Sequence, residues 1–284
     1  MCSVCGCSGQ SASVGPNRSD DNLHRHDHDH GHHHHGRSES GLSVPGLSDA
    51  QLIEIEQDIL SKNSAYADAI RKRLAARNIL ALNLVSSPGA GKTTLLEKTV
   101  TALKDTVPVS VVEGDQETSN DADRIACLGV PAVQVNTGRG CHLDAHMVGH
   151  ALDDLSLEKG SVVFIENVGN LVCPASFDLG EACKVVILSV AEGDDKPLKY
   201  PDMFDAAEIL VLNKIDLLPH VDFDVDQAIE RAHRINPELR VVQVSARNGS
   251  GMDEWLGLVL QMRAAQFDVN GTSADSINIW QGVA

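Results

Sequence analysis

Ser86-Ser87-Pro88-Gly89-Ala90-Gly91-Lys92-Thr93-Thr94 follows the apolar run 79–85 and precedes a helical pattern. A glycine-rich turn between a strand and a helix lets main-chain N–H groups surround a phosphate, while a lysine reaches the β- and γ-phosphates and a hydroxyl ligates Mg²⁺. The first glycine of the pattern G-x-x-x-x-G-K-S/T falls on Ser86. We predict that the phosphates contact Ser87, Pro88, Gly89, Ala90, Gly91, Lys92, Thr93 and Thr94.

A second polar motif, Asn213-Lys214-Ile215-Asp216, follows the apolar run 208–212. An aspartate there can accept two hydrogen bonds from the N1 and 2-amino groups of guanine, which adenine cannot offer. Alone, the motif would be an ordinary polar turn, but after a phosphate loop it predicts guanine selection. The chain is therefore expected to bind GTP and GDP. The expected base contacts come from Asn213, Lys214, Asp216, Ser245 and Ala246.

Length and composition fit one large α/β domain. The chain has 284 residues, of which 42% are hydrophobic and 3% aromatic, and its net charge is −17. This charge disfavours nucleic acid and anionic membranes as partners. No run approaches the roughly 18 apolar residues of a membrane span, and no secretory signal is visible. Seven cysteines in a nucleotide-binding chain suggest a reducing, cytoplasmic location, where cysteine clusters usually bind metals.

The pattern along the chain predicts three parts. Residues 1–48 are almost free of Ile, Leu and Phe and are expected to be a disordered extension. Residues 49–265 are expected to form the nucleotide-binding domain, with a leading helix between Ala50 and Arg77, and residues 266–284 a loose tail. Strands are predicted at 79–86, 108–113, 131–135, 161–166, 184–190, 208–213 and 240–244, and helices at 92–104, 119–128, 143–156, 224–235 and 252–265. This alternation predicts an α/β fold, a mostly parallel sheet covered by helices on both faces.

Acidic residues follow two of the predicted strands, at the edge where ligands of such sheets bind. Asp115 is the expected Mg²⁺-side acid together with Thr93, although a solvated turn acid is the competing interpretation. Glu166 ends another strand, and Gly169 lies three residues on, where its N–H could meet the γ-phosphate. The predicted catalytic residues are Lys92, Asp115 and Glu166.

The N-terminal extension carries two groups of soft metal ligands. Three thiols lie within six residues, at Cys2, Cys5 and Cys7. They suit a tetragonal Ni²⁺ site or a tetrahedral Zn²⁺ site. Eight of the thirteen histidines form a tract that favours loose binding of divalent ions, with an engineered tag as the alternative. These histidines are His24, His26, His28, His30, His32, His33, His34 and His35.

A third group of ligands lies within the domain. Cys141 and His142 are adjacent in a glycine-rich segment, and Cys173 follows the predicted γ-phosphate loop. Three ligands leave a metal site incomplete, which favours a site shared across a two-fold dimer. Four similar residues are interpreted otherwise. Cys127 and Cys183 are expected to be core residues, and His146 and His150 are expected to be surface residues, with a role as auxiliary ligands as the alternative.

Together these motifs resemble the HypB family of GTPases, which help insert nickel into nickel–iron hydrogenase. The resemblance rests on residues 2–7, the histidine tract, residues 86–94, 113–115, 136–144, 166–174 and 213–216. It implies a P-loop NTPase fold of SIMIBI type, GTP-promoted homodimers, a nickel or zinc site at the dimer interface from Cys141, His142 and Cys173, and a tight N-terminal nickel site. It also implies two partners, the metallochaperone HypA and the hydrogenase large subunit.

The function expected from this sequence is slow GTP hydrolysis coupled to Ni²⁺ delivery during hydrogenase maturation, with nickel storage added by the histidine tract. Two alternatives remain open. The chain could be mainly a nickel storage protein, or it could be a related metallocentre GTPase that serves urease or cobalamin enzymes.

Overall fold

The computed structural model describes residues 48–116 and 124–269. Contacts divide the chain into two compact units, Met1–Asp58 and Ile59–Ala284, and the fold below is that of the second. The predicted extension, apart from Ser48, lies outside the described residues, as does most of the predicted tail. The last helix continues to Val269, so the first residues of the segment predicted as a tail are helical.

Seven parallel strands form the sheet of the described residues, in the order β3-β2-β4-β1-β5-β6-β7. This order confirms the predicted parallel sheet and places β1 between β4 and β5. The strands are β1 (Leu80–Ser86), β2 (Val109–Asp115), β3 (Ala132–Asn136), β4 (Val162–Glu166), β5 (Cys183–Ser189), β6 (Ile209–Asn213) and β7 (Arg240–Gln243).

The longer described helices lie close to their predicted bounds. They are α1 (Asp49–Ala75), α2 (Lys92–Leu103), α4 (Ala145–Asp154), α8 (Val225–Ile235) and α9 (Met252–Val269). Four short helices were not predicted, because segments of four to six residues show no helical period: α5 (Cys173–Ser176), α6 (Lys196–Lys199), α7 (Pro201–Asp205) and η1 (Ile215–His220). Within the described ranges, no helix combines the length and the apolar character needed to span a bilayer.

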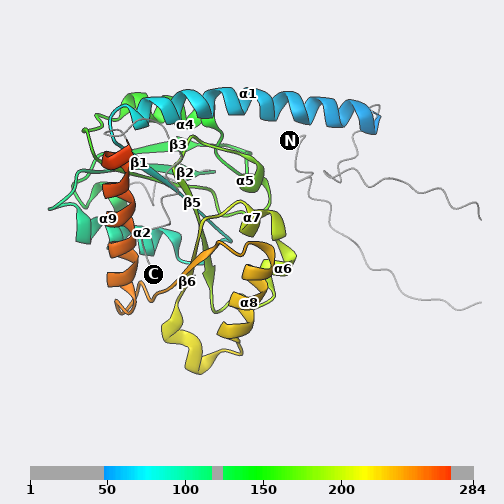
Figure 1. Cartoon of the computed structure of the whole chain (residues 1–284), viewed down its shortest axis with the longest axis vertical. Helices are drawn as coiled ribbons and strands as arrows, with labels where there is room; N and C mark the ends of the chain where they lie inside the picture. The colour runs from blue at the N-terminus through cyan, green and yellow to red at the C-terminus, as the bar shows by residue number, and fades with distance from the viewer. Residues whose placement is uncertain (1–47, 117–123, 270–284) are drawn as a thin grey trace, which may run out of the picture. The chain divides into compact units, whose positions relative to one another are not determined.

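Helices cover both faces of the sheet, as predicted. Figure 1 shows the strands between helices that include α4 on one side and α2 on the other. Leu82 and Leu84 of β1 face one layer, which contains α2 and α9, and there the Trp255 indole N–H donates to Thr99 Oγ1 at 2.8 Å. Ala81 faces the opposite layer, which contains α4 and the part of α1 after residue 58. Successive residues of β1 are therefore buried on opposite sides, which explains its continuous apolar run.

The two cysteines interpreted as core residues differ. Cys183 is buried in β5, as predicted, and burial raises the pKa of its thiol. The interpretation of Cys127 as a core residue was wrong, because its side chain is exposed. Residues 124–126 are helical, and Ile125 occupies the core position instead. Cys127 lies in the turn directly after these helical residues, where its side chain is exposed. The part of the predicted helix before residue 124, residues 119–123, lies outside the described residues.

The loop before β5 packs tightly against α1. Gly180 has a φ of +80°, and a Cβ there would lie 2.6 Å from the Ala67 carbonyl oxygen and 2.7 Å from Ile70 Cβ. Nearby, the Asn63 amide donates to the Asp178 carbonyl at 2.7 Å, and its Oδ1 accepts from Ala145 N–H at 2.8 Å. Residues 59–75 of α1 thus hold this loop and the start of α4 in fixed positions.

We expect Gly180→Ala to destabilise the fold through two effects. The left-handed backbone costs about 1–2 kcal/mol for a non-glycine residue, and the forced contact with α1 adds roughly 1–3 kcal/mol. Gly129→Ala is the matched control, because Gly129 has a φ of +78° but no atom within 4 Å of the place that a Cβ would occupy. Thermal unfolding of both variants measures the difference, and equal destabilisation would contradict the tight packing.

Candidate functional site

The predicted phosphate loop connects β1 to α2. Gly89 has a φ of +77° and Gly91 a φ of +97°, a region that favours glycine. A Cβ on Gly91 would also lie 2.7 Å from the Asn213 amide nitrogen. The sequence forms this turn because glycine stands at both left-handed positions, and α2 then begins at Lys92.

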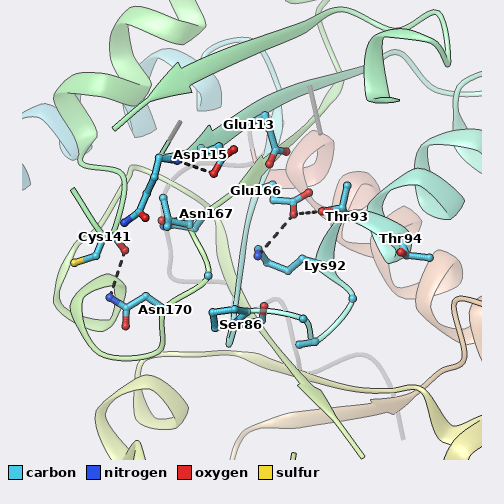
Figure 2. Close-up of a pocket in the computed structure, with 18 of the residues that line it drawn as sticks. Ser86, Lys92, Thr93, Thr94, Glu113, Asp115, Cys141, Glu166, Asn167 and Asn170 are labelled. Atoms are coloured by element: carbon cyan, nitrogen blue, oxygen red, sulfur yellow. Dashed lines mark hydrogen bonds and ion pairs between the residues drawn. The ribbon is translucent and has the colours of Figure 1, made fainter. Parts of the chain in front are cut away.

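A cavity of about 620 Å³ opens beside this loop (Figure 2). Its volume falls in the usual range of small-molecule sites. The lining comes from the loop, from the ends of β2 and β4, and from the segments that follow β3 and β4. Predicted site residues in the lining are Pro88, Gly89, Ala90, Gly91, Lys92, Thr93, Thr94, Asp115, Cys141, Glu166, Gly169 and Lys214.

Glu166 connects β4 to the start of α2. Its Oε1 accepts a hydrogen bond from Thr93 Oγ1 at 2.7 Å and lies 3.7 Å from Lys92 Nζ (Figure 2). The Glu166 side chain is only 2% exposed, so its charge is weakly screened and its attraction to the lysine is strengthened. The two residues predicted to contact phosphate and Mg²⁺ are thus oriented by one buried carboxylate.

A second buried acid, Glu113, escaped the sequence analysis, which favoured Asp115. Glu113 of β2 pairs in register with Glu166 of β4, and both side chains are 2% exposed and line the cavity. Asp115, the last residue of β2, also lines the cavity but is less buried, and its Oδ1 accepts from Gln116 N–H at 2.6 Å. Carboxylates and a hydroxyl are hard oxygen ligands that suit Mg²⁺. The donor set therefore fits a divalent cation bound beside Thr93.

The residues predicted to recognise guanine form a cluster beside the loop. Asn213 Nδ2 donates to the Ala90 carbonyl at 3.0 Å, while its Oδ1 accepts from Lys214 N–H at 2.8 Å and from Ala246 N–H at 3.3 Å. Lys214 Nζ donates to the Gly89 carbonyl at 2.6 Å. Asn213 is almost fully buried, so in this structure its side chain braces the loop.

Asp216 lies on η1, next to this brace. The Ser245 hydroxyl donates to Asp216 Oδ1 at 2.6 Å, which fixes the orientation of the carboxylate. Asp216, Ser245 and Ala246 are not among the residues that line the 620 Å³ cavity. The base-reading role of these residues stays a prediction, which their placement beside the phosphate loop supports.

Two further predicted residues lie close to the loop. A Cβ on Gly169 would lie 3.1 Å from Pro88 Cα, so the segment after β4 runs directly against the phosphate loop. The Ser87 hydroxyl accepts from Lys196 Nζ at 3.1 Å, and the lysine also lies 3.4 Å from Glu192. Ser87 therefore faces α6 and is absent from the cavity lining.

Cys141, His142 and Cys173 come together as the sequence analysis expected. One ligand atom from each lies within 4.8 Å of the other two, and this is the single group of its kind among the described residues. Both cysteines are free thiols with their sulfurs 3.1 Å apart, and Cys141 Sγ lies 3.7 Å from His142 Nδ1. Two thiolates and an imidazole suit Ni²⁺ or Zn²⁺.

The surroundings of His142 favour its neutral form. Burial lowers the pKa of this imidazole, an effect that the nearby carboxylate of Asp144 partly opposes. The ring packs against Phe177, with centroids 4.1 Å apart, and Phe177 follows the helix that carries Cys173. Neutral imidazole is the form that binds metals, so burial prepares this residue for a ligand role.

The group of Cys141, His142 and Cys173, called the metal-type cluster below, borders the 620 Å³ cavity. Cys141 lines the cavity, and its carbonyl accepts a hydrogen bond from Asn170 Nδ2 at 3.3 Å (Figure 2). Asn170 also lines the cavity and lies in the segment between Gly169 and Cys173. A ligand in the cavity would therefore lie close to both segments that carry the thiols.

His146 and His150 are not among the residues of this cluster. His146 and His150 are exposed on α4, with their Nε2 atoms 3.2 Å apart, which confirms their interpretation as surface residues. The three N-terminal cysteines and the histidine tract lie outside the described residues.

Comparisons with known proteins agree with this geometry. Residues 80–243 match the family model described as "CobW/HypB/UreG, nucleotide-binding domain". The chain is 59% identical over 231 residues to hydrogenase maturation factor HypB of Azotobacter chroococcum, covering 81% of this chain and 76% of the relative. It is 56% identical over 230 residues to HypB of Escherichia coli, covering 81% and 79%.

A solved structure resembles the chain as well. HypB from Helicobacter pylori, crystallised in complex with nickel, superposes with a TM-score of 0.69 at 40% identity. The match covers 76% of this chain and all of that one. Both the sequence and the fold of the described domain are therefore those of one family.

We expect Asn213→Ala to weaken binding of all nucleotides alike. Losing the brace leaves three backbone groups without their partner, at about 0.5–1.5 kcal/mol each, so affinity for GDP and for xanthosine diphosphate should fall by about tenfold or more. Asn236→Ala, which removes a similar brace to the Ala207 carbonyl away from the cavity, is the control. Isothermal titration decides, and a changed preference between the two bases would show that Asn213 reads the base.

Proposed function

The chain belongs to the CobW/HypB/UreG family of nucleotide-binding proteins and, within it, to the HypB hydrogenase maturation factors, and on this premise we propose that it is a GTPase that couples GTP binding and slow hydrolysis to delivery of Ni²⁺. The proposed recipient is the large subunit of a nickel–iron hydrogenase in the cytoplasm. One observation carries the proposal: Cys141 lines the same cavity as Lys92 and Thr93.

The nucleotide half of the proposal rests on the phosphate loop. Lys92 would neutralise charge on the β- and γ-phosphates, while the loop N–H groups hold them in place. Thr93 and Asp115, with Glu113 and Glu166 close by, would hold Mg²⁺, which supplies charge stabilisation at the transferred phosphoryl group when bound. Gly169 lies against Pro88 and would present its N–H to the γ-phosphate. The acids of this site would thus hold the cation beside the phosphate loop.

The metal half rests on the two thiols and the imidazole. Ni²⁺ is the cargo of the proposed reaction, and Zn²⁺ fits the same ligands. One chain contributes Cys141, His142 and Cys173, and a second copy in a GTP-promoted homodimer would complete the ligand set. The metallochaperone HypA is the proposed partner for metal exchange.

The N-terminal extension adds a second proposed role. Cys2, Cys5 and Cys7 would form a tight nickel site, and the histidine tract would hold further nickel loosely. The concentration of histidines in this tract favours storage as an additional function. Storage alone leaves the phosphate loop and the acids around it without a purpose.

We expect Asp216→Asn to weaken GTP binding and to favour xanthosine triphosphate. The substitution removes the paired, charge-assisted contact to guanine, which is worth about 1.5–3 kcal/mol, and the new amide complements the 2-oxo group of xanthine. Competition titration of the two nucleotides measures the change. Unchanged GTP affinity would remove the base-recognition role from Asp216.

The proposal as a whole predicts that the bound nucleotide changes nickel affinity at Cys173. If the bound nucleotide changes nickel affinity by some factor, bound nickel must change nucleotide affinity by the same factor, and about 5- to 150-fold is the usual range. The measurement is nickel titration of the full chain carrying Cys2→Ser, Cys5→Ser and Cys7→Ser, with GDP or a non-hydrolysable GTP analogue, followed by thiolate-to-nickel absorption.

In that titration, Cys173→Ala should shrink the factor, and Cys127→Ala, which alters an exposed cysteine elsewhere, should preserve it. Equal nickel affinities with the two nucleotides in the parent chain would refute the proposed coupling.

A further inference from the structure

Lys184 is a buried cation that the proposed chemistry does not use. It lies on β5, and its side chain is 7% exposed. Its Nζ lies 3.0 Å from the Pro174 carbonyl oxygen, 3.1 Å from that of Ala175 and 3.4 Å from that of Phe177. A lysine ammonium has three N–H donors, so these three carbonyls match its capacity.

The three carbonyls belong to the segment that carries Cys173. This segment includes the four-residue helix α5, whose carbonyls lack a following helical turn to bond to them. Lys184 replaces that turn with a single charged group anchored in the central sheet. The position of Cys173 is therefore set by β5 as well as by its own loop.

The carboxylate of Glu181 compensates the buried charge of Lys184 and connects it to Asn83 of β1. Glu181 Oε1 lies 3.9 Å from Lys184 Nζ and accepts from Asn83 Nδ2 at 3.0 Å, while its Oε2 accepts from Leu179 N–H at 2.6 Å. Burial raises the pKa of Glu181, and Lys184 is the main group that opposes the shift. Because each charge compensates the other, losing one would leave the other buried and uncompensated.

The next two side chains lead to the nucleotide cavity. Asn83 of β1 pairs in register with Lys184, and its Oδ1 accepts from Asn167 Nδ2 at 3.3 Å. Asn167 follows Glu166 directly and lines the cavity. Its Oδ1 accepts from Leu143 N–H at 3.1 Å, and Leu143 follows His142. Asn167 therefore lines the nucleotide cavity and also contacts Leu143, which follows His142, and Asn83.

We propose that Asn167, Asn83, Glu181 and Lys184 form a positioning network that holds the Cys141–His142 segment and the Cys173 segment at ligand distance and ties both to the nucleotide-binding end of β4. Asn167 holds the first segment through Leu143, and Lys184 holds the second through three carbonyls. A shift at Glu166 moves Asn167 with it, because the two residues are adjacent. The network thereby deepens the proposed nucleotide control of metal binding and rests on that function.

The test replaces the ammonium with an apolar chain of similar length. Lys184→Met is made in the full chain carrying Cys2→Ser, Cys5→Ser and Cys7→Ser, with Lys98→Met, which changes an exposed lysine on α2, as the matched control. Nickel affinity is measured by competition with a chelator and read from the thiolate-to-nickel absorption, in the presence of GDP and of a non-hydrolysable GTP analogue. GDP affinity and thermal unfolding are measured on the same samples.

We expect Lys184→Met to weaken nickel binding by about 10- to 100-fold, the usual effect of removing a group that supports metal ligands. The factor that separates the nickel affinities measured with the two nucleotides should fall towards one. GDP affinity should stay within about twofold, since Lys184 is not among the residues that line the cavity. Lys184→Arg, which restores a cationic donor, should recover part of the nickel affinity and of the factor. Lys98→Met should resemble the parent chain throughout.

Two controls keep the result decisive. If Lys184→Met does not fold, the double variant Glu181→Gln with Lys184→Met removes both charges together and should show the same losses. Unchanged nickel affinity and an unchanged factor in the folded variant would overturn the network. A parent chain with equal nickel affinities in both nucleotides would instead overturn the proposed coupling, while a loss of nickel affinity in Lys184→Met would still support the positioning role.

Discussion

The parallel pairing of β1 with both β4 and β5 is the constraint on which the rest of this structure depends. Parallel strands end at the same edge of a sheet, so the phosphate loop after β1 and the acidic segment after β4 must meet there. The contact between Gly169 and Pro88 shows how close the two segments come. Fixing β5 on the other side of β1 then brings Lys184 opposite Asn83, within reach of the loop that carries Cys173.

Buried charge sets the character of this edge. Glu113 and Glu166 lie in register on neighbouring strands, and two buried carboxylates so placed repel each other unless cations lie near. Lys92 supplies one cation, and a divalent ion beside Thr93 would supply more. A divalent ion bound there would therefore compensate two buried carboxylates that lie in register on neighbouring strands.

Much of this arrangement could be predicted from residue patterns, because it depends on local chemistry. The phosphate loop needs glycine at two left-handed positions and a lysine at the helix start, and all three stand close together in the sequence. The order of the strands was harder to predict from the sequence. Without that order, the sequence could not show that Glu113, and not Asp115, is the β2 residue paired with Glu166 of β4. Lys184 was hidden inside an apolar strand pattern, and the residues that connect it to the nucleotide cavity, Asn83 and Asn167, lie 101 and 17 residues away from it along the chain. Cys127 was misplaced because its apolar neighbours Ile125, Ala126 and Leu128 suggested burial, whereas the chain turns at Cys127 directly after the helical residues 124–126.

The ligands of the metal-type cluster are divided unequally between two segments. One segment carries Cys141 and His142, and the other carries only Cys173. A metal held by all three gains from the high effective concentration that each segment gives the other's donors. Separating the segments by a small distance would remove that advantage while the first segment kept its two donors. The ion would then remain attached but weakly held, with a coordination position open to an incoming donor. Transfer by ligand exchange would need no free aqueous metal and no unfolding of the domain.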